Sequence, residues 1–308
     1  MTRRAAGGWW RTTTLLRRVA AQVAAIALVS VHLLPAQQKV PLVLNHMMIV
    51  LDSATYHDVT HSPFVLGQLA AVDTGFLHGY DGGVGIRLMG RFNFLTMVPP
   101  VAAFHRQAGD AAIVLATTRP GDLAMLGRQG SFRSSGILSA SADTPLRADE
   151  YNDASQRLSP IGVDLLSDRA RLAIMEYAAF LVRDRARIDS LPPSDLATSR
   201  FLAPYFDRRR LFAFLTGATL AIPVADIAKV SRVLARDGVT VIAEGEGAIV
   251  KLDGFTLHLI PSFVGAGVKQ LQFALTRTAV GNPIYRFGPW SQLRFGPGPI
   301  AVWDFSAQ

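Results

Sequence analysis

Apolar and polar positions alternate along the first half of the chain in a way that predicts short strands separated by short helices. Residues 41–52 (PLVLNHMMIVLD) form an apolar run with branched side chains, which is typical of a strand. Serine followed by proline is a frequent helix start, so Ser62-Pro63 predicts a helix over 62–71. The later elements predicted in this half are a hairpin turning near Gly90-Arg91, a strand over 109–118, a helix ending at Gly130 and a strand over 171–182.

The second half repeats this order more clearly. A strand over 218–224 precedes a helix that begins at Asp226 and ends at Gly238, with Ile227, Val230 and Leu234 on one face. The segments VTVIAEG, GAIVKLDG, FTLHLIPS and VKQLQFALT follow as strands, and SQLRF and IAVWDF lie in a glycine- and proline-rich tail. The β-α-β-β-β order, found here and more loosely before residue 100, is an internal repeat that predicts an α+β fold.

Polar segments divide the chain. Residues 183–199 are polar, contain Pro192-Pro193 and predict a linker between a first domain over 40–182 and a second over 200–308. Residues 131–170 are rich in Ser, Asp and Arg, and a structureless stretch of that length is uncommon in a compact domain. This segment is expected to hold further strands or a flap.

The N-terminus predicts export. Five of the 31 basic residues lie within residues 1–36, which hold no acidic residue, and they precede the apolar stretch VAAQVAAIALVSVHLL over 19–34. A basic segment, a short apolar segment and a small residue at Ala36 are typical of a secretory signal peptide. An uncleaved membrane anchor is the alternative, although the stretch is short for a bilayer span of ~20 residues.

Charge and cysteine content exclude several classes of function. The net charge of +8 belongs mostly to the N-terminal segment, and no basic stripe interleaved with aromatic residues follows it, so nucleic-acid binding is not expected. The chain has no cysteine, which excludes disulfides, thiolate nucleophiles and cysteine-based zinc sites. We expect a periplasmic or secreted bacterial protein without stable membrane insertion once the signal is removed.

Several segments together resemble an uncharacterised secreted branch of the vicinal-oxygen-chelate, or glyoxalase-like, superfamily. They are LNHMMIVLDSATY, GRFNFLTMVPP, GDAAIVLATTRPGDLAML, IMEYAAFL, RFLAPYFDRRRLFAFLTGATLAIPVADI and QLRFGPGPIAVWDF. The resemblance implies two tandem glyoxalase-like domains built from βαβββ modules that curl around a cup, the second domain shortened. The resemblance leaves open whether copies of the chain associate into a homo-oligomer.

The resemblance also implies where metal ligands would stand in members of the superfamily that bind metal. The corresponding positions of the first domain are His46, Thr96, Ala111 or a neighbour, and Glu176, and those of the second domain are Thr219, His258, Gln270 and Trp303. His46 and Glu176 are the metal ligands that the first domain retains. A two-ligand site is weak and exchangeable, so no tightly held cofactor is expected, and a divalent metal is kept as an alternative.

Strand alternation suggests which side chains share a face with His46. Side chains two apart on a strand point the same way, so six residues are predicted to line the first-domain cup and contact a ligand. They are His46, Met48, Phe94, Thr96, Ile174 and Glu176. A hydrogen-bonded His46–Glu176 pair that only fills the core is the structural alternative.

The function expected is binding of a small organic molecule in the first-domain cup, by sequestration or sensing. One alternative is a metal-dependent lyase, isomerase or dioxygenase, which would need a further ligand such as His78 or His105. Another is a structural or partner-binding envelope protein that uses residues 131–170. The motif HDVTH over 57–61 has the i, i+4 histidine spacing of zinc-binding helices, but it lacks the intervening glutamate, and a polar connection is the favoured interpretation.

Overall fold

The computed structural model describes residues 39–73, 85–100, 107–119, 121–128, 161–163, 169–176, 198–263 and 266–305. Residues Val40–Gln308 form one compact unit. The predicted signal peptide over 1–36, most of the 131–170 segment and nearly all of the 183–199 linker lie outside the described residues, so the predicted domain boundaries stay predictions. Within the described part, no helix has the length and apolarity needed to span a membrane.

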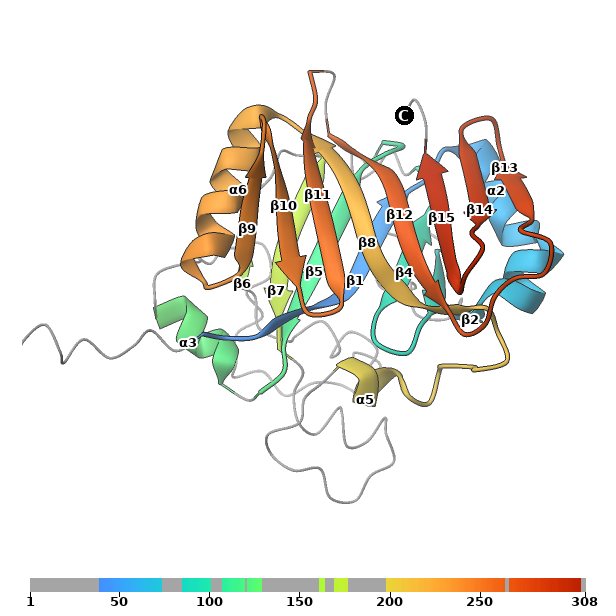
Figure 1. Ribbon diagram of the computed structural model, residues 1–308, viewed down its shortest axis with the longest axis horizontal. Helices are drawn as coiled ribbons and strands as arrows, with labels where there is room; N and C mark the ends of the chain where they lie inside the picture. The colour runs from blue at the N-terminus through green and yellow to red at the C-terminus, as the bar shows by residue number, and fades with distance from the viewer. Residues whose placement is uncertain are drawn as a thin grey trace, which may run out of the picture. The chain divides into compact units, whose positions relative to one another are not determined.

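The first half contributes a seven-stranded mixed sheet in the order β2-β3-β4-β1-β5-β7-β6 (Figure 1). Its strands are β1 (Leu42–Val50), β2 (Ala71–Asp73), β3 (Ile86–Met89), β4 (Phe94–Val98), β5 (Ala111–Thr117), β6 (Ile161–Val163) and β7 (Ala170–Met175). Its helical elements are α2 (Ser53–His61), a π-helical turn η1 (Val65–Leu69) and α3 (Asp122–Arg128). The central strand β1 runs parallel to β4 and antiparallel to β5.

The second half contributes an eight-stranded mixed sheet in the order β13-β14-β15-β12-β8-β11-β10-β9. Its strands are β8 (Phe212–Ile222), β9 (Thr240–Glu244), β10 (Gly247–Leu252), β11 (Phe255–Pro261), β12 (Gly267–Leu275), β13 (Ile284–Phe287), β14 (Ser291–Phe295) and β15 (Ile300–Phe305). Its helices are α5 (Thr198–Leu202), which precedes β8, and α6 (Val224–Arg236).

The predicted α+β fold class is confirmed. The orders β1-α2-β2-β3-β4 and β8-α6-β9-β10-β11 are two βαβββ modules, each followed by a second set of strands that joins the same sheet. In the second half these are β12 to β15, and the chain passes from β12 to β13 without an intervening helix. The second domain is therefore shorter because it lacks a helix at this point, and not because it has fewer strands.

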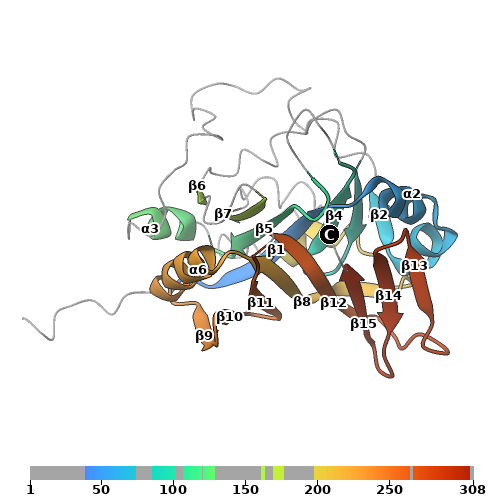
Figure 2. The same ribbon diagram turned by 90° about the horizontal axis from the view of Figure 1, so that it is seen from above.

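The hydrophobic core lies between the two sheets. One continuous cluster of buried side chains joins alternate residues of β1, such as Met47 and Ile49, to alternate residues of β8, such as Ala218 and Leu220. Figure 2 shows the two sheets as two layers, the first above the second in that view, with α6 at one end and α2 at the other. The alternate residues of each strand point away from this core.

Helix α6 has the predicted buried face but begins at Val224, two residues before the predicted Asp226, whereas α2 was not predicted. Ile227, Val230 and Leu234 are the buried residues of α6, and Gly238 follows the helix with a φ of 82°. The helix expected over 62–71 is confirmed in place, since residues 63–69 are helical and end in the π-helical turn η1, and Val65 N–H donates to Ser62 Oγ at 3.3 Å. Helix α2 forms earlier because the Asp52 carboxylate caps it by accepting a hydrogen bond from the Thr55 backbone N–H at 2.9 Å.

The turn between β3 and β4 joins the two sheets. Strand β11 pairs with β8 only from Gly217 onwards, so the first residues of β8 lack a strand on that side. The turn takes this place: Arg91 N–H donates to Ala213 O at 2.7 Å, and the Asn93 side chain accepts from Leu215 N–H at 2.7 Å and donates to Leu215 O at 3.0 Å. Asn93 thus satisfies both backbone groups of a buried residue.

Candidate functional site

A bulge in β1 sets the direction in which His46 points. The pairing of β1 with β5 shifts between Leu44 and His46, so Asn45 is an extra residue at that point. Leu44 lies in the core between the sheets, and after the bulge Met47 returns to it. His46 therefore faces the opposite side, which we call the outer face of the first sheet.

The His46 ring is held by an aromatic neighbour and a buried amide. It stacks on Phe94 with the ring centroids 4.5 Å apart and the planes at 13°. Its Nδ1 lies 2.7 Å from Asn45 Oδ1, and the Asn45 amide donates to Thr198 Oγ1 at 3.1 Å. Because the Asn45 oxygen only accepts, Nδ1 carries the proton and Nε2 keeps its lone pair. Burial, and secondarily the charge of Arg87, lowers the pKa of His46 to about 3.

Four of the six predicted site residues come together on the outer face. His46 pairs in register with Phe94, and Met48 pairs with Thr96. Met48 also packs against a small apolar cluster of Val50 and Val98 that is separate from the main core. The strand alternation was thus interpreted correctly for β1 and β4, while a ligand-binding role for these residues stays a prediction.

The structure does not bring the other two residues to His46. Ile174 pairs with Leu115 and lies with it in the core between the sheets, on the opposite face from His46. Glu176 comes just after β7, and its carboxylate accepts hydrogen bonds from Thr117 Oγ1 at 3.1 Å, from Gly121 N–H at 2.9 Å and from Leu123 N–H at 3.0 Å. Glu176 therefore holds the start of α3 and is not the partner of His46.

The donor groups at the implied metal positions of the first domain do not fit a metal. Glu176 is occupied by α3, and Thr96 offers a single hydroxyl group. Ala111 faces the core, and its neighbour Ala112, which pairs with Met48, also ends in a methyl group. The other neighbour of Ala111, Asp110, is a carboxylate, but it accepts from Arg169 Nε and from Gln107 N–H, each at 2.7 Å. Apart from this engaged carboxylate, His46 is the one imidazole or carboxylate that the described implied positions keep on this face; His78 and His105 lie outside the described residues.

The implied positions of the second domain form a polar row across its sheet. Thr219 pairs with His258 on one side and with Gln270 on the other, and Gln270 pairs with Asp304. Trp303, the residue implied by the resemblance, is instead fully buried in the core. The Asp304 carboxylate accepts from Gln270 Nε2 at 2.9 Å and from Arg294 Nη2 at 2.6 Å, so its charge is already neutralised. Among the described residues no group of three or more His, Asp or Glu could hold a metal ion.

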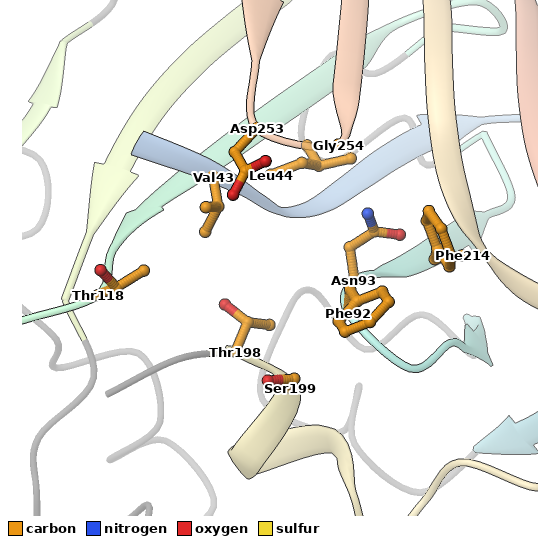
Figure 3. A pocket seen from close by; sticks show the side chains of 10 residues that line it. All are labelled: Val43, Leu44, Phe92, Asn93, Thr118, Thr198, Ser199, Phe214, Asp253 and Gly254. Carbon is orange, nitrogen blue, oxygen red and sulfur yellow. The ribbon is translucent and has the colours of Figure 1, made fainter. Parts of the chain in front are cut away.

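A cavity of about 330 Å³ opens where β1 begins, and its wall includes Thr198, the residue to which the Asn45 amide donates (Figure 3). It is bounded by the start of β1, the end of β5, the β3–β4 turn, α5, β8 and the β10–β11 turn. The residues that line it are Val43, Leu44, Phe92, Asn93, Thr118, Thr198, Ser199, Phe214, Asp253 and Gly254.

The polar groups on the cavity wall differ in their availability. The Asn93 amide is fully used by Leu215, whereas Thr198 Oγ1 accepts from Asn45 and keeps its own proton to donate. Asp253 is the charged residue among the described lining residues, and Figure 3 shows its carboxylate facing across the cavity toward Thr198. Its turn is held against β1 by a bridge between Asp253 and Val43.

Phe92 and Phe214 supply the aromatic side of the cavity. Their rings meet edge to face with centroids 5.0 Å apart, and Phe92 is 41% exposed. Flat apolar walls with a few polar groups are the usual lining of sites for small organic molecules. The arrangement can bind such a molecule; no serine–histidine pair within hydrogen-bonding distance occurs among the described lining residues to act on it.

Sequence reasoning missed the cavity because its walls come from segments distant in the chain. Thr198 falls in the polar segment interpreted as a linker, and Asp253 falls in GAIVKLDG, a segment interpreted as a strand. The sequence signal that was available is Asp253-Gly254 itself, a turn pair that places a charged side chain at the end of a sheet. Nothing local relates it to Thr198.

Comparison with solved structures gives distant matches. A xylose isomerase-like TIM barrel/4-hydroxyphenylpyruvate dioxygenase fusion protein matches at 12% identity and a TM-score of 0.44, over 81% of this chain and 40% of that one. A hypothetical protein from Staphylococcus aureus matches at 8% identity and a TM-score of 0.42, over 73% and 88%. A triple mutant of 4-hydroxymandelate synthase from Streptomyces coelicolor matches at 15% identity and a TM-score of 0.40, over 88% and 94%.

Comparison by sequence is more decisive. Among curated proteins none matches the chain. A family model described as a family of unknown function (DUF5829) matches residues 44–305, a span that runs from β1 to the last residue of β15. The chain therefore belongs to the DUF5829 family of unknown function.

Proposed function

We propose that this glyoxalase-like protein binds a small organic molecule in the cavity beside Asn45. The observation that carries the proposal is the combination of an apolar and aromatic wall with Asp253 and Thr198 facing each other across about 330 Å³. That volume lies at the lower end of the range for small-molecule sites. The predicted site is thereby moved from the outer face around His46 to this cavity.

The lining favours a ligand with a flat apolar body and a positively charged or hydrogen-bond-donating end. The aromatic side at Phe92 and Phe214 suits the body, and the Asp253 carboxylate suits the charged end. Asn45 fixes the position of Thr198 on the cavity wall: its side chain is 1% exposed and its amide donates a hydrogen bond to Thr198. A fixed polar wall lowers the entropic cost of binding.

The two alternatives from the sequence, a metal-dependent enzyme and a partner-binding envelope protein, gain no comparable support. A metal-dependent lyase, isomerase or dioxygenase would need donors that the described residues of the implied positions do not supply. A partner-binding envelope protein would use residues 131–170, most of which lie outside the described residues. Export through the predicted signal peptide remains part of our proposal, and mass spectrometry of the protein recovered from its natural cell would test it by showing whether the chain begins after Ala36.

The binding proposal is tested with a matched pair of probes that share a phenyl ring and differ in charge. Phenethylamine carries a cation at neutral pH, and phenethyl alcohol does not. Calorimetric titration of the untagged chain should show tighter binding of the amine, by up to about fivefold, since an ion pair with an exposed carboxylate such as Asp253 is worth ~0.2–1 kcal/mol.

Three variants make this test specific. Asp253→Asn keeps a turn-forming residue and removes the charge, so the preference for the amine should disappear. Ser199→Phe should fill the cavity and abolish binding of both probes. Thr219→Val, on the outer side of the second sheet, is the control and should bind like the unchanged chain. Equal binding of the two probes, or binding that survives Ser199→Phe, would place the site elsewhere.

A further inference from the structure

Two histidines form a pair on the solvent side of α2, away from the cavity. His57 and His61 are exposed, and their rings stack with centroids 4.2 Å apart and planes at 20°. The spacing i, i+4 brings side chains of one helix to the same face. The pair is thus the HDVTH motif of the sequence, formed on a helix that extends through His61.

The hydrogen bonds of the pair indicate which nitrogen of each ring carries the proton. His61 Nδ1 lies 2.8 Å from the carbonyl oxygen of His57, and His57 Nδ1 lies 3.5 Å from Asp58 Oδ1. A carbonyl or carboxylate oxygen only accepts, so these contacts favour the tautomer with the proton on Nδ1 and the lone pair on Nε2. This is the arrangement of metal-binding histidines, which donate their other N–H to a carbonyl or carboxylate.

The helix that carries the pair is anchored to the second sheet. Asp58 Oδ2 accepts from Gly288 N–H at 2.8 Å, and Thr55 Oγ1 donates to Phe287 O at 3.1 Å. The two imidazoles therefore project from a backbone that is held in place.

We infer that His57 and His61 form a surface site for a divalent first-row transition metal, bound through the two Nε2 atoms with water in the remaining positions. Imidazole suits Zn²⁺, Ni²⁺ and Cu²⁺, and a site with two protein ligands is exchangeable. The site is separate from the cavity proposed above and does not depend on it. Nor does it use the implied positions on the two sheets, where the donors do not fit a metal.

Calorimetric titration of the untagged chain with NiCl₂ and with MnCl₂ at pH 7.5 tests the inference. Ni²⁺ should bind and Mn²⁺ should bind far more weakly, following the general order of affinities of nitrogen ligands. His57→Ala and His61→Ala should each weaken Ni²⁺ binding at least about tenfold, since even the outer partners of metal ligands contribute that much. Alanine is a good helix former, so these exposed changes should leave α2 intact.

Electron paramagnetic resonance with one equivalent of Cu²⁺ gives a second readout. The unchanged chain should show two coordinated nitrogens, and either single variant should show one. His258→Ala, on β11, is the matched control and should retain both the Ni²⁺ affinity and the two-nitrogen spectrum. Unchanged Ni²⁺ affinity in the double variant His57→Ala/His61→Ala would overturn the inference, as would a Cu²⁺ spectrum without paired nitrogens.

Discussion

At His46, burial and, secondarily, the charge of Arg87 keep the imidazole neutral. The structural alternative considered from the sequence was a pair with Glu176, which follows β7, whereas the observed partner is the adjacent residue Asn45. Neighbours on a strand normally point to opposite faces, so this contact depends on the bulge at Asn45. A bulge leaves no clear mark in an apolar run, which is why the sequence predicted the direction of His46 but not its partner.

The low pKa of His46 makes the stability of the fold sensitive to acid. The folded pKa of about 3 lies below the unfolded value of 6.5, so protons bind preferentially to the unfolded chain between these pH values. The stability contributed by the neutral ring is complete above pH 6.5 and is lost as the pH falls toward 3. Urea unfolding at pH 7 and 4.5 should show a loss that is roughly 2 kcal/mol smaller in His46→Gln than in the unchanged chain. An identical loss in both would mean that His46 titrates normally.

At the scale of elements, periodic apolar patterns were predictive and polar ones were not. Helix α6 could be predicted because its buried stripe repeats every three to four residues. Helix α2 buries only Thr55 and Val59 among its residues, so its sequence carries a weak pattern, and Asp52 was interpreted as a strand end when it is also the N-cap. Tertiary contacts with β13 supply the stability that its own pattern does not show.

Glu176 stabilises the packing of secondary-structure elements, because its carboxylate holds the start of α3. Three hydrogen bonds to its carboxylate join the end of β7 to the end of β5 and the first turn of α3. Glu176→Gln replaces one accepting oxygen by a donor, and we expect the free energy of unfolding to fall by ~1–2 kcal/mol. Urea unfolding measures this. Glu246→Gln, at an exposed turn of the second sheet, is the control and should change it by less than ~0.5 kcal/mol; an equal effect of both would remove the capping role.

At the scale of the whole molecule, the junction of the two sheets could not be predicted. The sequence indicates two sets of strands, and the repeat indicates that they are alike, but the Asn93–Leu215 contact joins residues 122 positions apart. No local pattern distinguishes Gly90, Arg91 and Asn93 from an ordinary hairpin turn. The same is true of the cavity, whose walls meet only after the sheets have packed.

Gly90 tests how closely the two sheets approach. A Cβ atom there would lie 2.8 Å from Ala213 O and closer still to Asn93 O, neither of which is the end of a flexible side chain. We expect Gly90→Ala to lower the free energy of unfolding by ~2 kcal/mol or more, as overpacking does. Gly67→Ala, where a Cβ meets nothing within 4 Å, is the matched control and should be neutral or slightly stabilising. Thermal unfolding of Gly90→Ala and Gly67→Ala measures this difference in stability.

Because a turn from the first half completes the hydrogen bonding of β8, the two halves should not survive separation. A fragment of residues 200–308 would leave Ala213 O and both backbone groups of Leu215 without their partners along an apolar strand, and such edges recruit other chains. We expect this fragment to aggregate when it is expressed alone, and to become soluble when residues 40–182 are expressed with it. During synthesis, the first half would then act as the template on which the later strands settle.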